Sequence, residues 1–320
     1  MTKRAREKVA TILELREKVR GFVSEYDVFI RIVLKFLLTF ISLRTVVGFL
    51  GQSITGNVMI GFVVAGLICA ALPAAVSPAV CGAGAVVVLL ARLPQFAGVL
   101  GVVLLIMILV YYAYIPDNAV VSQITLILAI LGLPYLAPVC VGLYKKPHAS
   151  IGVGFGMVLY YLTVSMKSIM LSVSTMTDSE DADVIGMLTT QLGQNREIVF
   201  AVLLAVFVVV VVYAVRNIAI DYAWQMAVGI GILVTLLAYL VADYTLELYK
   251  SMAGIFGGCA IAAVVAFFIG FMSFHLDYSR TEYVQFEDEE YKYYVKAVPK
   301  VTVSTKEKTL QSINETDAEE

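Results

Sequence analysis

Charge is scarce through most of this sequence. Charged residues make up 15% of the 320 residues and hydrophobic residues 60%, whereas a soluble domain carries ~25% charged residues. Of the 48 charged residues (23 basic and 25 acidic), 29 lie in residues 1–28 and 277–320, which leaves 19 for the 248 residues between them. This absence excludes an ordinary soluble globular protein and predicts a membrane domain over residues 29–276.

Catalytic and metal-binding motifs are missing as well. The chain has two histidines, His148 and His275, and neither has a carboxylate at helical spacing. H-E-x-x-H, G-x-S-x-G and Walker-type glycine patterns do not occur. We therefore expect no enzyme activity, no catalytic residue, no metal and no cofactor. No Asp or Glu lies at the centre of an apolar segment, which argues against a proton- or sodium-coupled carrier that relies on carboxylates and leaves room for a neutral, backbone-lined site.

The four cysteines do not form a redox or metal motif. Cys69, Cys81, Cys140 and Cys259 all lie in apolar segments without a C-x-x-C spacing. We interpret them as buried small apolar residues. The first 28 residues lack the apolar core and cleavage site of a signal peptide, so we expect the chain to enter the membrane through its own first helices.

The N-terminal segment, residues 1–28, reads as a basic amphipathic helix. Over residues 3–22, Val9, Ile12, Leu13 and Val19 lie close to one helical face. Basic residues beside a membrane favour its cytoplasmic side, so this helix is expected on the inner membrane surface or as a solvated helix before the first span. Neither chain end is a polybasic arm of the kind that binds nucleic acid.

The apolar middle predicts an all-α bundle of about eight or nine spans. Eight are clear: 57–72, 75–91, 95–115, 119–143, 151–171, 197–215, 222–242 and 253–275. Arg31, Lys35 and Arg44 make the segment 29–50 ambiguous, because a central charge costs ~2.5–3.5 kcal/mol to insert. We prefer an interfacial or re-entrant segment there to a ninth span, because both termini then lie in the cytoplasm with the basic loops, and the polar stretch 172–196 lies outside.

Two proline-containing breaks, Pro73–Gly82 and Pro134–Gly142, are the strongest sequence pointer to a site. Each proline removes a backbone donor and clashes with the preceding turn, so both places should be broken or kinked helices. Paired interruptions of this kind mark the central sites of transporters. For the first break, a tight turn at Pro73 with Pro78 in the next helix's first turn is an equal alternative. The substrate-path candidates are Pro73, Pro78, Gly82, Gln123, Pro134, Pro138, Gly142 and Gln225.

Small residues one helical turn apart predict close helix packing. Gly152 with Gly156, and Gly254 with Gly258, show this spacing.

The C-terminal tail, residues 277–320, differs in composition from the apolar middle. Two strand-like runs, within residues 281–298, flank the acidic residues 287–290 and predict a β-hairpin. Because isolated hairpins are marginal in water, this one should dock on the membrane domain or on a cytoplasmic protein partner. Residues 300–320 read as disordered.

The tail sequence VQFEDEEYKYYVKAVPK, the preceding span and the LPYLAP break together resemble an uncharacterised family of polytopic membrane proteins of Gram-positive anaerobes. The resemblance covers most of the chain in the order of its spans. It implies a bacterial membrane protein with a structured cytoplasmic tail, and it implies no substrate or catalytic residue.

Two functions fit these patterns. The first is a permease-like or transport-associated protein whose two breaks meet near the bilayer midplane. The second is a non-catalytic scaffold that recruits a cytoplasmic partner through its tail. The expected partners are the lipid bilayer, that cytoplasmic protein at 281–298 and, as an open alternative, a second copy of the chain.

Overall fold

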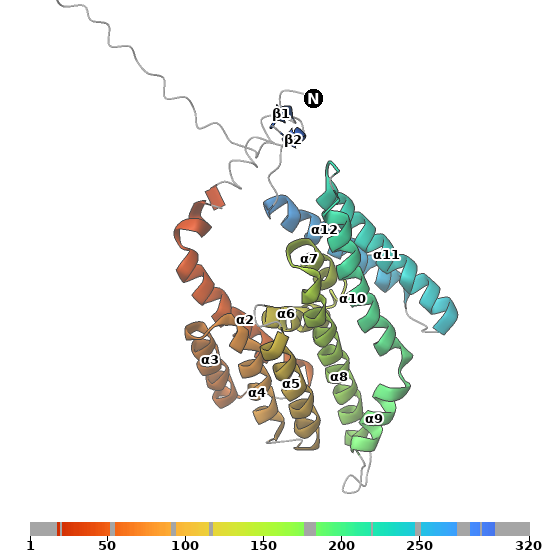
Figure 1. Cartoon of the computed structure of the whole chain (residues 1–320). Coiled ribbons are helices and arrows are strands. Elements are labelled where there is room, and N and C mark those ends of the chain that lie inside the picture. The colour runs from red at the N-terminus through yellow and green to blue at the C-terminus, as the bar shows by residue number, and fades with distance from the viewer. Residues whose placement is uncertain are drawn as a thin grey trace, which may run out of the picture. The chain divides into compact units, whose positions relative to one another are not determined.

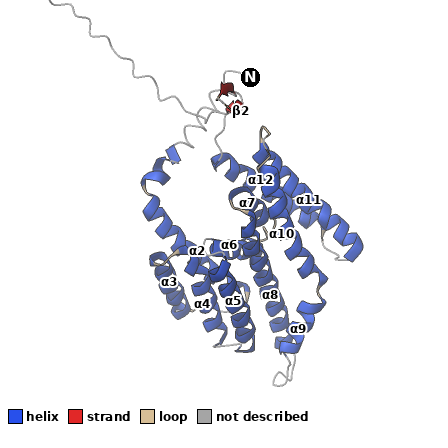
Figure 2. Cartoon of the chain, in the orientation of Figure 1, coloured by secondary structure: helices blue, strands red, loops and turns tan. Residues whose placement is uncertain are grey.

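The computed structural model describes residues 18–19, 21–51, 55–90, 94–114, 118–175, 184–218, 220–246, 251–273, 282–288 and 290–297. Within them the chain is almost entirely helical (Figure 1, Figure 2). It divides into two compact units, residues 28–273 and the two chain ends, residues 1–27 with 274–320. The predicted basic helix before residue 18 and the predicted disorder of 300–320 lie outside the described residues.

The first unit is a bundle of α-helices. Its elements are α2 (Asp27–Phe49, which begins one residue before the unit), α3 (Gly56–Ala71), the 3-10 turn η1 (Ala74–Val76), α4 (Ser77–Leu90), α5 (Pro94–Tyr114), α6 (Ala119–Ile130), α7 (Leu136–Tyr144), the 3-10 turn η3 (Pro147–Ala149), α8 (Ser150–Thr175), α9 (Val184–Gln194), α10 (Arg196–Arg216), α11 (Ala223–Leu246) and α12 (Met252–Ser273).

Among the described residues, six helices are long and apolar enough to cross a bilayer: α2, α5, α8, α10, α11 and α12. Their outer faces expose large apolar side chains such as Val102, Leu203 and Val264. Such faces are covered by lipid rather than by water. The predicted all-α membrane bundle is therefore confirmed, and the chain is an integral membrane protein. Three of the eight clear spans that the sequence predicted, 57–72, 75–91 and 119–143, are instead shorter apolar helices: α3, α4 and the pair α6 and α7.

The ambiguous segment 29–50 forms one continuous helix, α2. Its charges lie near the helix surface, because Lys35 is half-buried and Arg44 is exposed. Arg44 lines a cavity of about 230 Å³ with Phe40, Met59 and Phe62. The helix is long enough to span the bilayer, which differs from the interfacial segment that we preferred from the sequence.

The first proline break is a turn between two helices. α3 ends at Ala71, and Leu72 is extended, as the residue before a proline prefers. η1 follows, and Pro78 is the second residue of α4. The Lys35 ammonium on α2 donates to the Leu72 carbonyl at 2.9 Å, so a cation satisfies an acceptor at the C-terminal end of α3. This is the tight-turn alternative for Pro73.

The second proline break divides the predicted span 119–143 into α6 and α7. Gly132 has a φ of 83°, and its N–H donates to Ala129 O while the Leu133 N–H donates to Leu128 O. These two bonds form a Schellman motif, which ends a helix with glycine in the left-handed region. Pro134 then prevents the helix from resuming at once. The break predicted from Pro134 and Pro138 is confirmed.

α6 lies at the centre of the bundle and packs closely against α8 (Figure 1). α8 allows this approach because Gly152 and Gly156 face α6: a Cβ on Gly156 would lie 2.7 Å from the Ser122 carbonyl oxygen. The polar stretch 172–196, predicted as an outer loop, instead contains the C-terminal end of α8 and all of α9.

The second unit contains the predicted hairpin. β1 (Glu282–Glu287) pairs antiparallel with β2 (Lys292–Ala297). Val284 lies opposite Val295, and Phe286 lies opposite Tyr293 with their ring centroids 4.9 Å apart. Paired residues point to the same face, so one face of the hairpin is apolar and exposed.

Candidate functional site

A buried cluster of neutral polar side chains lies where α2, α4 and α6 meet. α2 contributes Thr39 and Ser42, α4 contributes Ser77 and Cys81, and α6 contributes Gln123. Thr39, Ser42, Ser77 and Gln123 are each at most 4% exposed. Polar groups this deep in an apolar bundle are costly unless they bind one another.

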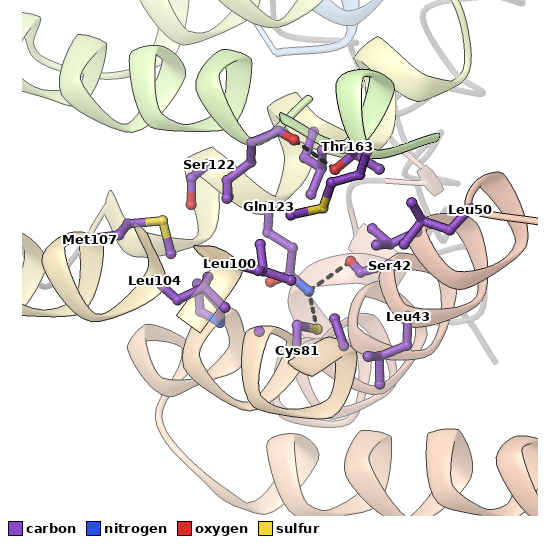
Figure 3. A pocket seen from close by; sticks show the side chains of 17 residues that line it. Ser42, Leu43, Leu50, Cys81, Leu100, Leu104, Met107, Ser122, Gln123 and Thr163 are labelled. Carbon is purple, nitrogen blue, oxygen red and sulfur yellow. Dashed lines mark hydrogen bonds between the residues drawn. The ribbon is translucent and has the colours of Figure 1, made fainter. Parts of the chain in front are cut away.

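The Gln123 carboxamide is the centre of this cluster. Its Oε1 accepts a hydrogen bond from Ser77 Oγ at 2.9 Å. Its Nε2 donates to Ser42 Oγ at 2.7 Å and to Cys81 Sγ at 2.9 Å (Figure 3). Ser77 Oγ also lies 3.1 Å from Thr39 Oγ1. Both amide donors and the amide acceptor of Gln123 are thus satisfied.

Helical spacing explains why these residues meet. Thr39 and Ser42 are three residues apart, and Ser77 and Cys81 are four apart, so each pair lies on one face of its helix. The Thr39 and Ser42 hydroxyls also donate to carbonyls one turn earlier, at Lys35 O and Leu38 O. A Ser or Thr inside a helix commonly makes this bond.

A cavity of about 50 Å³ adjoins the cluster (Figure 3). Its wall is mostly apolar, with leucine and methionine the commonest side chains, and its polar groups come from Ser42, Cys81, Ser122, Gln123 and Thr163. The Ser122 and Thr163 hydroxyls donate to carbonyls of their own helices, Ala119 O and Leu159 O. Each hydroxyl has one proton, so their oxygens face an occupant only as acceptors. This volume holds a few water molecules or one small solute.

The structure separates the predicted substrate-path residues into groups. Pro78, Gly82 and Gln123 line the cavity of about 50 Å³. Pro134 and Pro138 line a different cavity of about 10 Å³. Within the described part of the chain, the two breaks therefore line separate cavities.

Three further candidates lie away from both cavities. Pro73 is exposed in the turn before α4, and Gln225 is half-buried on α11. Gly142 lies against α10, where a Cβ would meet Val212 Cβ at 2.7 Å. Whether any of the eight candidates lies on a substrate path stays a prediction.

Of the predicted packing glycines, three lie at a helix contact and one is exposed. Gly152 and Gly156 lie at the contact of α8 with α6, as described above. On α12, a Cβ on Gly258 would lie 3.0 Å from the Tyr135 ring. Gly254 is exposed and faces only Ser251, a neighbour on its own chain segment.

Sequence reasoning selected Gln123 and missed the other four members of its cluster as site residues. Ser77 and Cys81 stand inside the proline segment, and Thr39 and Ser42 stand inside the ambiguous apolar segment. Their signal is a polar pair at a spacing of three or four residues in an otherwise apolar helix. Cys81, interpreted from the sequence as a small apolar residue, is instead a hydrogen-bond acceptor for Gln123.

Among the described residues, no group of three His, Cys, Asp or Glu side chains is placed to hold a metal ion. Comparison of the chain with protein-family models, curated proteins and solved structures finds no match. The site must therefore be interpreted from its own geometry.

Proposed function

We propose that this integral membrane protein is a permease-like or transport-associated protein of a bacterial cell membrane, with both termini in the cytoplasm. The observation that supports this is the neutral polar cluster centred on Gln123 beside a cavity in an apolar bundle. Polar groups inside a membrane are expensive and are most often kept where a path or a ligand requires them.

The composition of the cavity wall narrows the class of solute. Leucine and methionine side chains favour a small apolar or weakly polar body. The oxygens of Ser122 and Thr163 favour a solute that donates hydrogen bonds, because both hydroxyl protons are used within their helices. A small uncharged solute with a hydrogen-bond donor fits this wall.

Thiol labelling tests whether the cavity has access to water. Two single-cysteine proteins keep only Cys81, which lines the cavity, or only Cys69, which is buried on α3. A small, polar, membrane-impermeant thiol reagent should modify the Cys81 protein in intact cells and leave the matched Cys69 protein unmodified. If Cys81 stays inert even to a membrane-permeant reagent, the cavity is sealed and the transport proposal fails.

The hairpin supports a second candidate function, a scaffold. Val284, Phe286, Tyr293 and Val295 form its exposed apolar face. An exposed apolar face on a two-stranded sheet is suited to binding a protein partner. In this alternative the bundle anchors the tail, and the tail recruits a cytoplasmic protein.

Two variants separate the candidate functions in cells that need the protein. Transport through the Gln123 cavity predicts that Gln123→Leu abolishes function, while deletion of residues 277–320 is tolerated. Scaffolding predicts the reverse. Membrane levels of both variants must equal those of the wild type, so that loss of the protein is not read as loss of activity.

A further inference from the structure

Arg44 is a cation on a membrane-spanning helix, and the chain offers it no acid nearby. From Val28 to Pro116 the sequence contains no Asp or Glu, so α3, α4 and α5 cannot supply a counter-charge. Asp27, at the start of α2, lies 17 residues earlier, or ~25 Å along the helix axis. Within the described residues, the Arg44 guanidinium forms no ion pair or hydrogen bond. A counter-charge for Arg44 must therefore come from a ligand or from solvent.

The cavity of about 230 Å³ that Arg44 lines has an otherwise apolar wall. Its other lining residues are Phe40 on α2 and Met59 and Phe62 on α3. Phe62 is buried, whereas Arg44 and Met59 are exposed, so the cavity opens at the surface of the bundle. Ile60 beside Met59 is exposed as well. An apolar surface of this kind on a membrane protein faces lipid.

Packing of α3 on α2 closes the inner side of this cavity. Phe62 belongs to the same buried cluster as Leu43 on α2. One turn further along α3, Gly66 lies against α2, where a Cβ would be 2.8 Å from the Phe36 ring. The cavity therefore has protein on its inner side and the bilayer on its outer side.

The position of Arg44 along α2 matches the level of lipid head groups. The helix has 23 residues and ends at Phe49. At 1.5 Å per residue its length is ~34 Å, slightly more than the ~30 Å hydrocarbon core of a bilayer. Arg44 lies ~8 Å before the end of the helix, and a long arginine side chain extends toward the interface. The phosphates of one leaflet are thus within its reach.

The chemistry of the wall selects the ligand. A guanidinium binds a phosphate through two parallel hydrogen bonds. The apolar side chains around Arg44 favour an anion that carries an apolar body, which inorganic phosphate lacks. A zwitterionic phospholipid also carries an ammonium, and the segment between Asp27 and Asp117 has no acid to bind it. A phospholipid with a net negative charge fits these requirements.

We propose that the cavity between α2 and α3 binds one anionic phospholipid of the bilayer, with the lipid phosphate on Arg44 and the apolar part of the lipid against Phe40 and Met59. Basic pockets between membrane helices are a recurrent setting for such head groups. This site is separate from the Gln123 cavity, and it does not depend on the protein being a transporter.

Thermal unfolding of the full-length protein in detergent micelles tests the site. The unfolding midpoint is measured while dioleoyl phosphatidylglycerol, dioleoyl phosphatidylethanolamine or inorganic phosphate is added at constant ionic strength. A ligand that binds only the folded state raises the midpoint in a saturable way. The half-saturating concentration of phosphatidylglycerol should be about tenfold or more below that of phosphatidylethanolamine, and phosphate should have no effect. Equal responses to the two lipids, or to phosphate alone, would overturn the proposal.

Matched variants locate the effect. Arg44→Gln should raise the half-saturating concentration of phosphatidylglycerol about tenfold or more, because it removes hydrogen bonds between charged groups. Met59→Trp keeps the charge, fills the cavity and should have the same effect. Lys35→Gln removes a different cation of α2, one that donates to Leu72 O, and should leave the concentration unchanged. If Arg44→Gln binds like the wild type, or Lys35→Gln weakens binding equally, the proposal is wrong. If Arg44→Gln does not fold, Met59→Trp at an exposed position still decides.

Discussion

The bundle contains two polar regions, and their side chains offset the free-energy cost of burial in different ways. The Gln123 cluster, on α2, α4 and α6, consists of neutral groups in which the amide donors and acceptor are matched. The Glu197 region, where α8 meets α10, contains a carboxylate that accepts a hydrogen bond from the Tyr161 hydroxyl. All side chains of the first region are neutral, whereas the second region contains an ionisable group.

This difference teaches how each region tolerates burial. A matched neutral network is stable when empty and offers little to an ion. The Glu197 carboxylate is only half-buried, and it accepts a hydrogen bond from the Tyr161 hydroxyl. The following substitutions test the contrast between the two regions.

The largest loss of stability is expected at the contact of α6 with α8, which holds the Gln123 cluster in place. Gly156→Ala would put a Cβ 2.5 Å from Thr125 Cβ and 2.7 Å from Ser122 O, and the backbone of α6 cannot yield without moving Gln123. We expect a loss of about 3 kcal/mol in the free energy of unfolding. Denaturation in mixed micelles measures it. Gly229→Ala is the control, because nothing lies within 4 Å of that Cβ. Equal effects of the two variants would contradict close packing of α6 on α8.

The next largest loss of stability is expected from a substitution that breaks the hydrogen bonds of Gln123. Gln123→Leu leaves the Ser42, Ser77 and Cys81 groups without their amide partner, and we expect a loss of about 2 kcal/mol. Gln225→Leu is the matched control on the half-buried face of α11 and should change stability by less than about 0.5 kcal/mol. A Gln123→Leu protein as stable as the wild type would show that the network contributes nothing to the fold.

Two buried tyrosines sharpen the comparison. Tyr161→Phe removes the hydrogen bond to Glu197, and we expect a loss of about 1.5 kcal/mol. Tyr111, 3% exposed, has its hydroxyl close to Ser122 but forms no hydrogen bond of good geometry within the described part of the chain. Tyr111→Phe should therefore be neutral or stabilising. The two unfolding free energies are compared in the same detergent, and a reversed order would contradict both assignments.

The smallest effect concerns the cations at the helix ends. Lys35 donates to Leu72 O at the end of α3, and Arg216 donates to Leu143 O near the end of α7. We expect Lys35→Met and Arg216→Met each to lower the free energy of unfolding by about 1 kcal/mol, since cations stabilise helix C-termini. Lys18→Met, in the chain-end unit, serves as the control. An unchanged stability would show that water satisfies these carbonyls equally well.

Periodicity and composition predicted much of this architecture. The apolar runs predicted the membrane helices, Gly132 and Pro134 lie where the helix breaks, and strand-like runs around an acidic turn predicted the hairpin. These are local properties, because a glycine, a proline or an alternating pattern acts on its own neighbours in the chain.

The sites could not be predicted in the same way. Glu197 is the second residue of α10, and nothing in the local sequence indicates the Tyr161 hydroxyl that donates to it. Ser42 and Gln123 are 81 residues apart, and no local pattern joins them. Which helix faces which depends on close approaches such as that at Gly156.

The amino-acid sequence by itself determined that this chain is a membrane protein, where most of its apolar helices lie and where one of them breaks, and that its tail forms a hairpin. Burial of apolar surface and local backbone chemistry are sufficient for each of these. Only the tertiary structure decided that a neutral network and the hydrogen bond between Tyr161 and Glu197 occupy separate regions. Hydrogen bonds and electrostatic neighbours between distant residues depend on how the helices pack against one another.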